Sequence, residues 1–172
     1  MTEAKNRIKF KGNPLTLVGS RPRLGGPAPD FEALANDLSP FKLSEVQGKV
    51  LVICSVPSLD TPVCDTEVRR FNELATSLGN DVVVLVISMD LPFAQKRWCG
   101  AAGIKNVQTI SYHNQAKFGN AYGVLIEELR LLARTVFVVD KKGVIRYIEI
   151  VDELSHEPDY DAALEAVREV ER

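Results

Sequence analysis

Cys64 is the side chain of this sequence whose setting most favours covalent chemistry. It follows Thr61 and Pro62, where a strongly apolar run has ended and an amphipathic segment begins. Threonine is a favoured N-cap residue and proline suits the first helical position, so Cys64 is expected in the first turn of a helix. Unpaired backbone N–H groups and the positive end of the helix dipole stabilise a thiolate there. The pattern predicts a thiolate nucleophile, and a core-facing thiol is the alternative.

The other two cysteines have different surroundings. Cys54 lies inside the apolar run 50–54, where a free cysteine serves as a small, unreactive hydrophobe. Cys99 is expected near the C-terminal end of a helix, where the dipole disfavours a thiolate. Cys64 is therefore the better attacking group, and Cys99 is better suited to resolve an oxidised partner. The two are not a C-x-x-C pair, and local spacing does not decide whether they bond.

Arg134 directly precedes the apolar run 135–139. A cation at the end of a buried strand needs either solvent or an anionic partner, so the simplest interpretation is an arginine paired with a carboxylate. Arg69 and Arg70 fall off the helical face that carries Cys64 and are expected in solvent.

Composition and charge bear on the number of domains, the partners and the cellular location of the protein. The 172 residues predict a single domain, and a formal net charge of −2 gives no electrostatic reason to expect nucleic acid or an anionic membrane as partner. Neither histidine, His113 or His156, lies near a cysteine at metal-ligand spacing, so no metal or cofactor is expected. Three cysteines without a repeating spacing suit a reducing compartment. Residues 1–7 lack the apolar centre of a secretory signal, and no run is long enough to span a membrane, which makes a cytoplasmic location the expectation.

The elements around the cysteines follow from hydrophobic spacing. The run 50–54 is typical of a strand buried on both faces, and a helix starting at Pro62 has apolar residues three and four positions apart as far as Leu78. Residues 79–80 supply its stop, and a second buried strand over 82–87 implies a parallel crossover. Pro92 opens a helix that Gly100 and Gly103 end.

The remaining elements complete an α/β pattern. A hairpin over 8–17 is expected to turn at residues 12–14, a short strand pair is expected around 41–43, and 125–132 is left undetermined. Other expected elements are a strand at 107–110, a helical or irregular stretch at 118–122, a hairpin joining 135–139 to 144–148, and a final amphipathic helix from Tyr160 to Val167. Parallel strands followed by an antiparallel hairpin describe a sandwich of thioredoxin type, with a central mixed sheet flanked by helices.

Residues 57–64, with the sequence PSLDTPVC, resemble the P-x-x-x-T-x-x-C motif of peroxiredoxins. Further segments resemble the thiol peroxidase subfamily, a group of atypical two-cysteine peroxiredoxins, and the resemblance covers essentially the whole chain. These segments are Arg69–Asn72, Asp90–Gln95, Trp98–Gly100 and Glu157–Tyr160. One difference is Pro62, where glycine is also common in the family.

The resemblance implies a role for each candidate residue. Cys64 matches the peroxidatic cysteine, Thr61 and Pro57 its motif partners, Arg134 the pocket arginine and Cys99 the resolving cysteine. It also implies one thioredoxin-like domain over 1–172, with an N-terminal hairpin extension at 1–20. The implied activity is reduction of hydrogen peroxide and alkyl hydroperoxides through a sulfenic acid and an intrachain disulfide, in antioxidant defence. Thioredoxin would restore the thiols, and the family is typically a homodimer.

Three other functions fit the same residues. A thiol–disulfide oxidoreductase would need an exposed dithiol, and the absence of C-x-x-C counts against it. A redox sensor would use the disulfide as a stoichiometric switch without rapid turnover. A thioredoxin-fold binding module with three structural cysteines would show little thiol reactivity.

Overall fold

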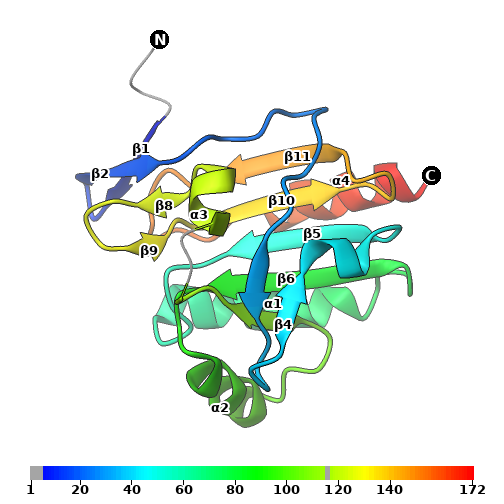
Figure 1. Ribbon diagram of the computed structural model, residues 1–172, viewed down its shortest axis with the longest axis horizontal. Coiled ribbons are helices and arrows are strands. Elements are labelled where there is room, and N and C mark those ends of the chain that lie inside the picture. Colours follow the sequence, from blue (N-terminus) through cyan, green and yellow to red (C-terminus); the bar gives the residue numbers. More distant parts are fainter. Residues whose placement is uncertain (1–5, 115–116) are drawn as a thin grey trace.

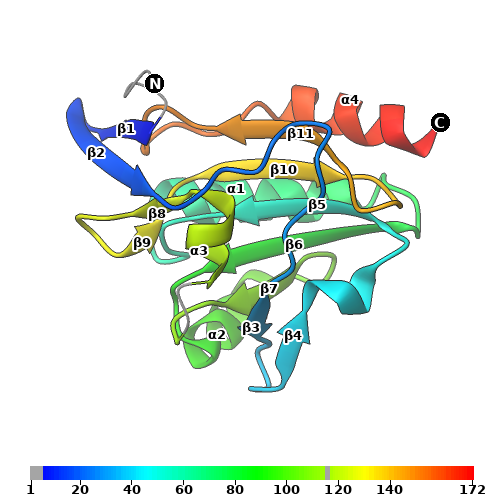
Figure 2. The same cartoon turned by 45° about the horizontal axis from the view of Figure 1, so that its top comes forward.

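Within residues 6–114 and 117–172, which the computed structural model describes, seven strands form one mixed sheet (Figures 1 and 2). The three central strands lie parallel, and the outer strands join antiparallel. The order across the sheet is β11 (Ile145–Ile150), β10 (Thr135–Val139), β5 (Val50–Ser55), β6 (Val82–Ser88), β7 (Gln108–Ser111), β3 (Glu32–Leu34) and β4 (Pro40–Lys42). The predicted mixed sheet, its parallel pair and its closing hairpin are therefore confirmed.

Side chains of the central strands alternate between two cores. In β5, Leu51 and Ile53 belong to one buried cluster, whereas Val52 and Cys54 belong to the cluster on the opposite face. Because successive residues of a strand point to opposite faces, a strand covered on both sides reads as an unbroken apolar run. This explains why the apolar runs 50–54 and 82–87 identified strands of the sheet centre.

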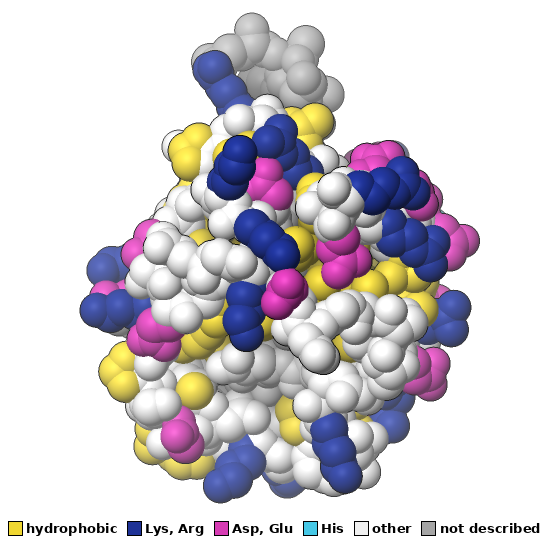
Figure 3. Space-filling model, turned by 90° about the vertical axis from the view of Figure 1, so that its right-hand side faces the viewer, with side chains coloured by type: hydrophobic (Ala, Val, Ile, Leu, Met, Phe, Trp, Pro, Cys, Tyr) yellow, Lys and Arg dark blue, Asp and Glu magenta, His cyan; other side chains and the backbone are white. Residues whose placement is uncertain are grey.

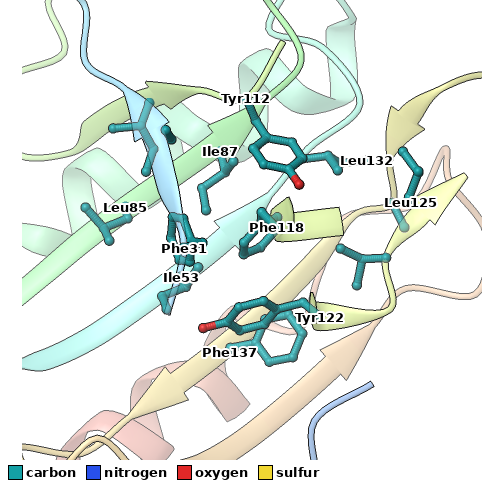
Figure 4. Close-up of a cluster of buried hydrophobic side chains, with 14 of the residues drawn as sticks. Phe31, Ile53, Leu85, Ile87, Tyr112, Phe118, Tyr122, Leu125, Leu132 and Phe137 are labelled. Carbon is teal, nitrogen blue, oxygen red and sulfur yellow. The ribbon is translucent and has the colours of Figure 1, made fainter. Parts of the chain in front are cut away.

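Helices cover both faces of the sheet (Figure 1). Helices α1 (Pro62–Ala75) and α4 (Tyr160–Glu171) pack on the face that carries Cys54, and α2 (Pro92–Ala102) contacts β7. The short helix α3 (Lys117–Tyr122) lies on the other face. There the rings of Phe118 and Tyr122 stack with their centroids 4.5 Å apart (Figure 4). Both rings contact Phe31, which directly precedes β3, and Tyr122 also contacts Phe137 of β10.

Two helix ends differ from the sequence expectation. Helix α1 ends at Ala75, before Leu78, because the hydroxyls of Thr76 and Ser77 bond back to carbonyls of the last turn at 2.6 and 2.8 Å. In α2, Gly100 lies inside the helix, and only Gly103, with a left-handed φ of 67°, forms its C-cap.

The N-terminal hairpin belongs to a second, smaller antiparallel sheet. Strands β1 (Arg7–Phe10) and β2 (Asn13–Val18) pair, and β2 continues the sheet to β8 (Leu125–Ile126) and β9 (Leu131–Leu132). The turn consists of Lys11 and Gly12, both at positive φ, so the prediction of a turn over 12–14 was wrong. Two-residue hairpins favour this left-handed geometry, which glycine adopts without strain. Residues 1–5 of the expected 1–20 extension lie outside the described residues.

Candidate active site

The sheet and α1 together place Cys64 in a buried position. Strand β5 ends at Ser55, a loop follows, and α1 begins at Pro62, so Cys64 lies in the first turn with no exposed surface. Thr61 is the N-cap residue as predicted, but its hydroxyl does not cap the helix. It donates instead to the carbonyl of Ser58 at 2.9 Å, within the preceding turn of the loop.

Arg134 contacts the sulfur of Cys64. Its Nη1 lies 3.4 Å from Cys64 Sγ and 2.6 Å from Oε2 of Glu67, while Nε and Nη2 donate to the carbonyl of Leu154 at 3.2 and 2.8 Å. The Arg134 side chain is only 2% exposed. The expected pairing of Arg134 with a carboxylate is confirmed, and the same side chain also reaches the thiol.

Glu67 is the member of this cluster that the sequence analysis missed. It lies three residues after Cys64, and residues three apart share a face of a helix, so this spacing could have revealed it. The side chain is fully buried, and its Oε1 has no hydrogen-bond partner within the described part of the chain. Burial raises the pKa of Glu67 to about 7, although Arg134 acts in the opposite direction.

The raised pKa of Glu67 predicts a pH-dependent stability. In the unfolded chain a glutamate titrates near pH 4.3, so from there to about pH 7 the folded protein holds the proton more tightly. The contribution of Glu67 to stability is present at the acid end and lost as pH rises through 7. When the pH rises from 5 to 8, the unfolding free energy of wild type should fall, as measured by urea denaturation. This fall should be about 2–3 kcal/mol larger in wild type than in Glu67→Gln, which cannot titrate at position 67.

The matched control is Glu73→Gln, because Glu73 is an exposed carboxylate of the same helix. It should follow the pH dependence of wild type. Equal pH dependence in wild type and Glu67→Gln would contradict the assignment of this titration to Glu67.

An apolar cavity of about 390 Å³ lies next to Arg134, the arginine that contacts the thiol, while the buried Cys64 is not itself among the lining residues. Pro57, Thr61 and Arg134 line the cavity, so three of the sequence-predicted site residues meet there. Phe10 from the N-terminal hairpin and Leu129 from the β8–β9 turn form other parts of its wall. Pro57 itself is buried. The structure thus brings residues from four separate parts of the chain to this cavity.

The loop before α1 is fixed to the end of β6. Asp90 accepts hydrogen bonds from the Ser58 hydroxyl at 2.7 Å and from the backbone N–H of Leu59 at 2.8 Å, and its second oxygen also accepts from Ser88 at 2.7 Å. These bonds hold the segment that carries Pro57 and Thr61 in place over the start of α1.

Cys99 lies on α2, near its C-terminal end as expected. Its side chain is half-buried, its Sγ lies 3.4 Å from Oγ1 of Thr109, and burial raises the pKa of this thiol. Cys64 and Cys99 are both free thiols in this structure. The residues beside them are in contact, since Nε1 of Trp98 donates to Oδ1 of Asp65 at 2.8 Å. This bond joins the two helices that carry the cysteines.

Cys54 is fully buried in β5, and burial raises the pKa of its thiol well above the ordinary value. The expectation of a buried cysteine there is confirmed. Cys54→Ser should leave turnover of the hydroperoxides expected from the sequence resemblance within about twofold of wild type, because a thiol in such a site does not react. The buried hydroxyl should cost about 1–2 kcal/mol of unfolding free energy. Steady-state kinetics and urea denaturation of the variant check both values, and a large loss of turnover in a folded variant would contradict them.

The remaining candidates do not line the cavity next to Arg134. Arg69 and Arg70 are exposed, and so are His113 and His156, as expected. In residues 6–114 and 117–172 no group of three or more His, Cys, Asp or Glu side chains could hold a metal ion. None of the described helices has the length and apolar character needed to cross a bilayer. On the face drawn in Figure 3, basic and acidic side chains are interspersed.

Comparison with known families places the chain in one family. The profile of the Redoxin family matches residues 23–164, which include β5, α1 and Arg134. The chain belongs to the Redoxin family.

Curated relatives and a solved structure are similar over nearly the whole chain. A thiol peroxidase from Oceanobacillus iheyensis is 57% identical over 159 residues, covering 92% of this chain and 96% of the relative. A thiol peroxidase from Bacillus subtilis is 53% identical over 161 residues, covering 94% and 96%. A crystal structure of a peroxiredoxin-like protein from Aquifex aeolicus superimposes with a TM-score of 0.90 at 42% identity, covering 96% of this chain and 97% of the other. Within the Redoxin family this chain therefore belongs with the thiol peroxidases.

Proposed function

We propose that Cys64 is the peroxidatic cysteine of this enzyme and that it reduces hydrogen peroxide and alkyl hydroperoxides. The observation that carries the proposal is the contact between Arg134 Nη1 and Cys64 Sγ, 3.4 Å apart, because Arg134 also lines the apolar cavity. A guanidinium fixed by Leu154 and Glu67 stabilises a thiolate at that position without having to reorganise.

In the first step the Cys64 thiolate attacks the terminal oxygen of the hydroperoxide. An S–O bond forms as the O–O bond breaks, the sulfur is oxidised by two electrons, and the leaving oxygen takes a proton to become an alcohol or water. Arg134 stabilises the negative charge that moves from sulfur to the leaving oxygen. The product on the enzyme is a Cys64 sulfenic acid.

Thr61 and Pro57 orient the substrate in this proposal. The hydroxyl proton of Thr61 is directed to Ser58, so its oxygen is free to accept a hydrogen bond from the O–H of the hydroperoxide. This differs from a role as donor to the thiolate. Pro57 packs at the cavity wall and limits the access of water.

The lining of the cavity supports organic hydroperoxides as substrates beside hydrogen peroxide. Phe10, Leu129 and Leu131 offer apolar surface that an alkyl group would remove from water. Because Phe10 belongs to the N-terminal hairpin, we propose that the chain from 1 to 172 works as one domain, in which the hairpin extension completes the substrate site.

In the second step Cys99 attacks the sulfenic sulfur, and an intrachain disulfide forms with release of water. Disulfide formation requires Cα atoms within about 7 Å of each other. Both cysteines lie on helices joined through Trp98 and Asp65, so we infer that the region around Cys99 unwinds locally before the bond forms. The helix-terminating Gly103 and the internal Gly100 favour movement on that side.

Thioredoxin is the proposed reductant of this disulfide, in a cytoplasmic homodimer that takes part in antioxidant defence. The thiol peroxidases at more than 50% identity support this assignment. A coupled assay with NADPH, thioredoxin reductase and thioredoxin tests it, with tert-butyl hydroperoxide and hydrogen peroxide as substrates. Many turnovers per enzyme are expected. A single stoichiometric oxidation would instead favour a redox sensor, and disulfide exchange without peroxide consumption would favour a thiol–disulfide oxidoreductase.

A further inference from the structure

The thiol of Cys99 is the first group of a hydrogen-bond network that links α2 to β7 and to the turn between β3 and β4. Its Sγ lies 3.4 Å from Oγ1 of Thr109 on β7, and that hydroxyl donates to Oδ1 of Asn36 at 3.1 Å. Asn36 belongs to the turn between β3 and β4, so the contact joins the edge of the sheet to α2. Thr109 is only 3% exposed, which limits competition from water.

The Thr109 hydroxyl has a single proton, and the acceptor of that proton determines which atom is the donor in the hydrogen bond between Thr109 and Cys99. Because that proton is donated to Asn36, the bond between Thr109 and Cys99 requires the cysteine S–H as its donor. The arrangement therefore holds Cys99 as a protonated thiol. Burial acts in the same direction and has the largest influence, so the pKa of Cys99 is raised on balance, although the side chains of Thr109 and Asn36 lower it.

We propose that Thr109, oriented by Asn36, is a positioning residue that holds the Cys99 thiol in the reduced packing and thereby slows the resolving step. This rests on the proposed function, in which Cys99 attacks the Cys64 sulfenic acid. In that attack the S–S bond forms as the S–O bond breaks, and the sulfenic oxygen leaves as water with the thiol proton. Cys99 must first give up its bond to Thr109.

The restraint also sets how often the sulfenic acid is oxidised further. A sulfenic acid that waits for Cys99 can react with a second peroxide and become sulfinic acid. Slower resolution therefore increases the fraction of enzyme lost to sulfinic acid at high peroxide. Removing the restraint should protect Cys64 from this second oxidation.

Two substitutions at Thr109 separate the hydroxyl from its packing. Thr109→Val keeps the shape and removes the hydroxyl, whereas Thr109→Ser keeps the hydroxyl and removes a methyl group. Trp98 is the only tryptophan in the sequence and adjoins Cys99, so stopped-flow fluorescence can follow the peroxide-independent resolving phase. Thr109→Val should raise the rate of that phase by about 3- to 10-fold, the value of one modest hydrogen bond, while Thr109→Ser stays near wild type.

A third variant gives a readout that packing alone would not move. Asn36→Ala removes the acceptor of the Thr109 proton, so the hydroxyl can then donate to the Cys99 sulfur, and it also removes the Asn36 side chain, which lowers the pKa of Cys99. The pH profile of the resolving phase should therefore move in this variant and stay unchanged in Thr109→Ser. Intact mass after excess hydrogen peroxide should also show less sulfinic acid at Cys64 in Thr109→Val than in wild type.

The outcomes distinguish the inference from the function on which it rests. Equal resolving rates in wild type and Thr109→Val, or an equal acceleration in Thr109→Ser, would overturn the role of the hydroxyl while leaving a Cys64–Cys99 disulfide in place. Absence of that disulfide in wild type after peroxide treatment would overturn the proposed function and this inference together.

Discussion

Cys64→Ser is expected to lower peroxide turnover by about 1,000-fold or more, because an alcohol cannot supply the thiolate that attacks the peroxide. The protein should remain folded, since serine is close to cysteine in size and only the small pocket beside Arg134 is affected. Peroxide consumption in the thioredoxin-coupled assay measures the effect.

The control for Cys64→Ser is the same substitution at Cys54, which is equally buried but lies in the middle of β5. Cys54→Ser should retain turnover. Loss of turnover at Cys54 with retention at Cys64 would reverse the assignment of the reactive cysteine.

Arg134→Met is expected to have the second largest effect. It removes the cation beside the thiol and should lower the rate constant for Cys64 oxidation by about 100- to 1,000-fold, the usual cost of one preorganised donor. It also leaves the carboxylate of Glu67 buried without its partner, so above pH 7 it should cost about 3–5 kcal/mol of unfolding free energy. Stopped-flow oxidation and urea denaturation at pH 8 measure the two effects separately.

A second substitution separates catalysis from stability at this ion pair. In Arg134→Met combined with Glu67→Gln, no buried charge remains unpaired, so most of the lost stability should return while oxidation of Cys64 stays slow. Arg70→Met, which removes an exposed arginine of α1, serves as the control and should change neither quantity. Recovery of the oxidation rate in the double variant would contradict a direct role for Arg134.

The spacing of apolar and helix-starting residues predicted the fold correctly where the information lay within one strand or one helix. The unbroken apolar run of β5 identified a central strand, and Thr61 with Pro62 identified the start of α1 and hence the position of Cys64. The turn of the N-terminal hairpin and the end of α1 were misplaced, because single hydrogen bonds and left-handed backbone angles decide such boundaries.

Contacts between distant residues could not be predicted from pattern. Arg134 was expected to meet some carboxylate, but only the folded chain brings it to Glu67 and Cys64 at once. The same holds for Asp90, which fixes the loop of Pro57 and Thr61, and for Phe10, which reaches the cavity through pairing of the hairpin with β8. Thr61 shows a further limit, since its position was correct but its hydroxyl bonds to Ser58.

In the proposed reaction, peroxide oxidises Cys64 and Cys99 resolves the resulting sulfenic acid. Intact mass and free-thiol count after one equivalent of hydrogen peroxide test this directly on wild type, Cys64→Ser and Cys99→Ser. Wild type should lose two hydrogens and two thiols, Cys99→Ser should retain a trappable sulfenic acid, and Cys64→Ser should keep its remaining thiols. Unchanged thiols in wild type, or the same disulfide in either variant, would contradict the account.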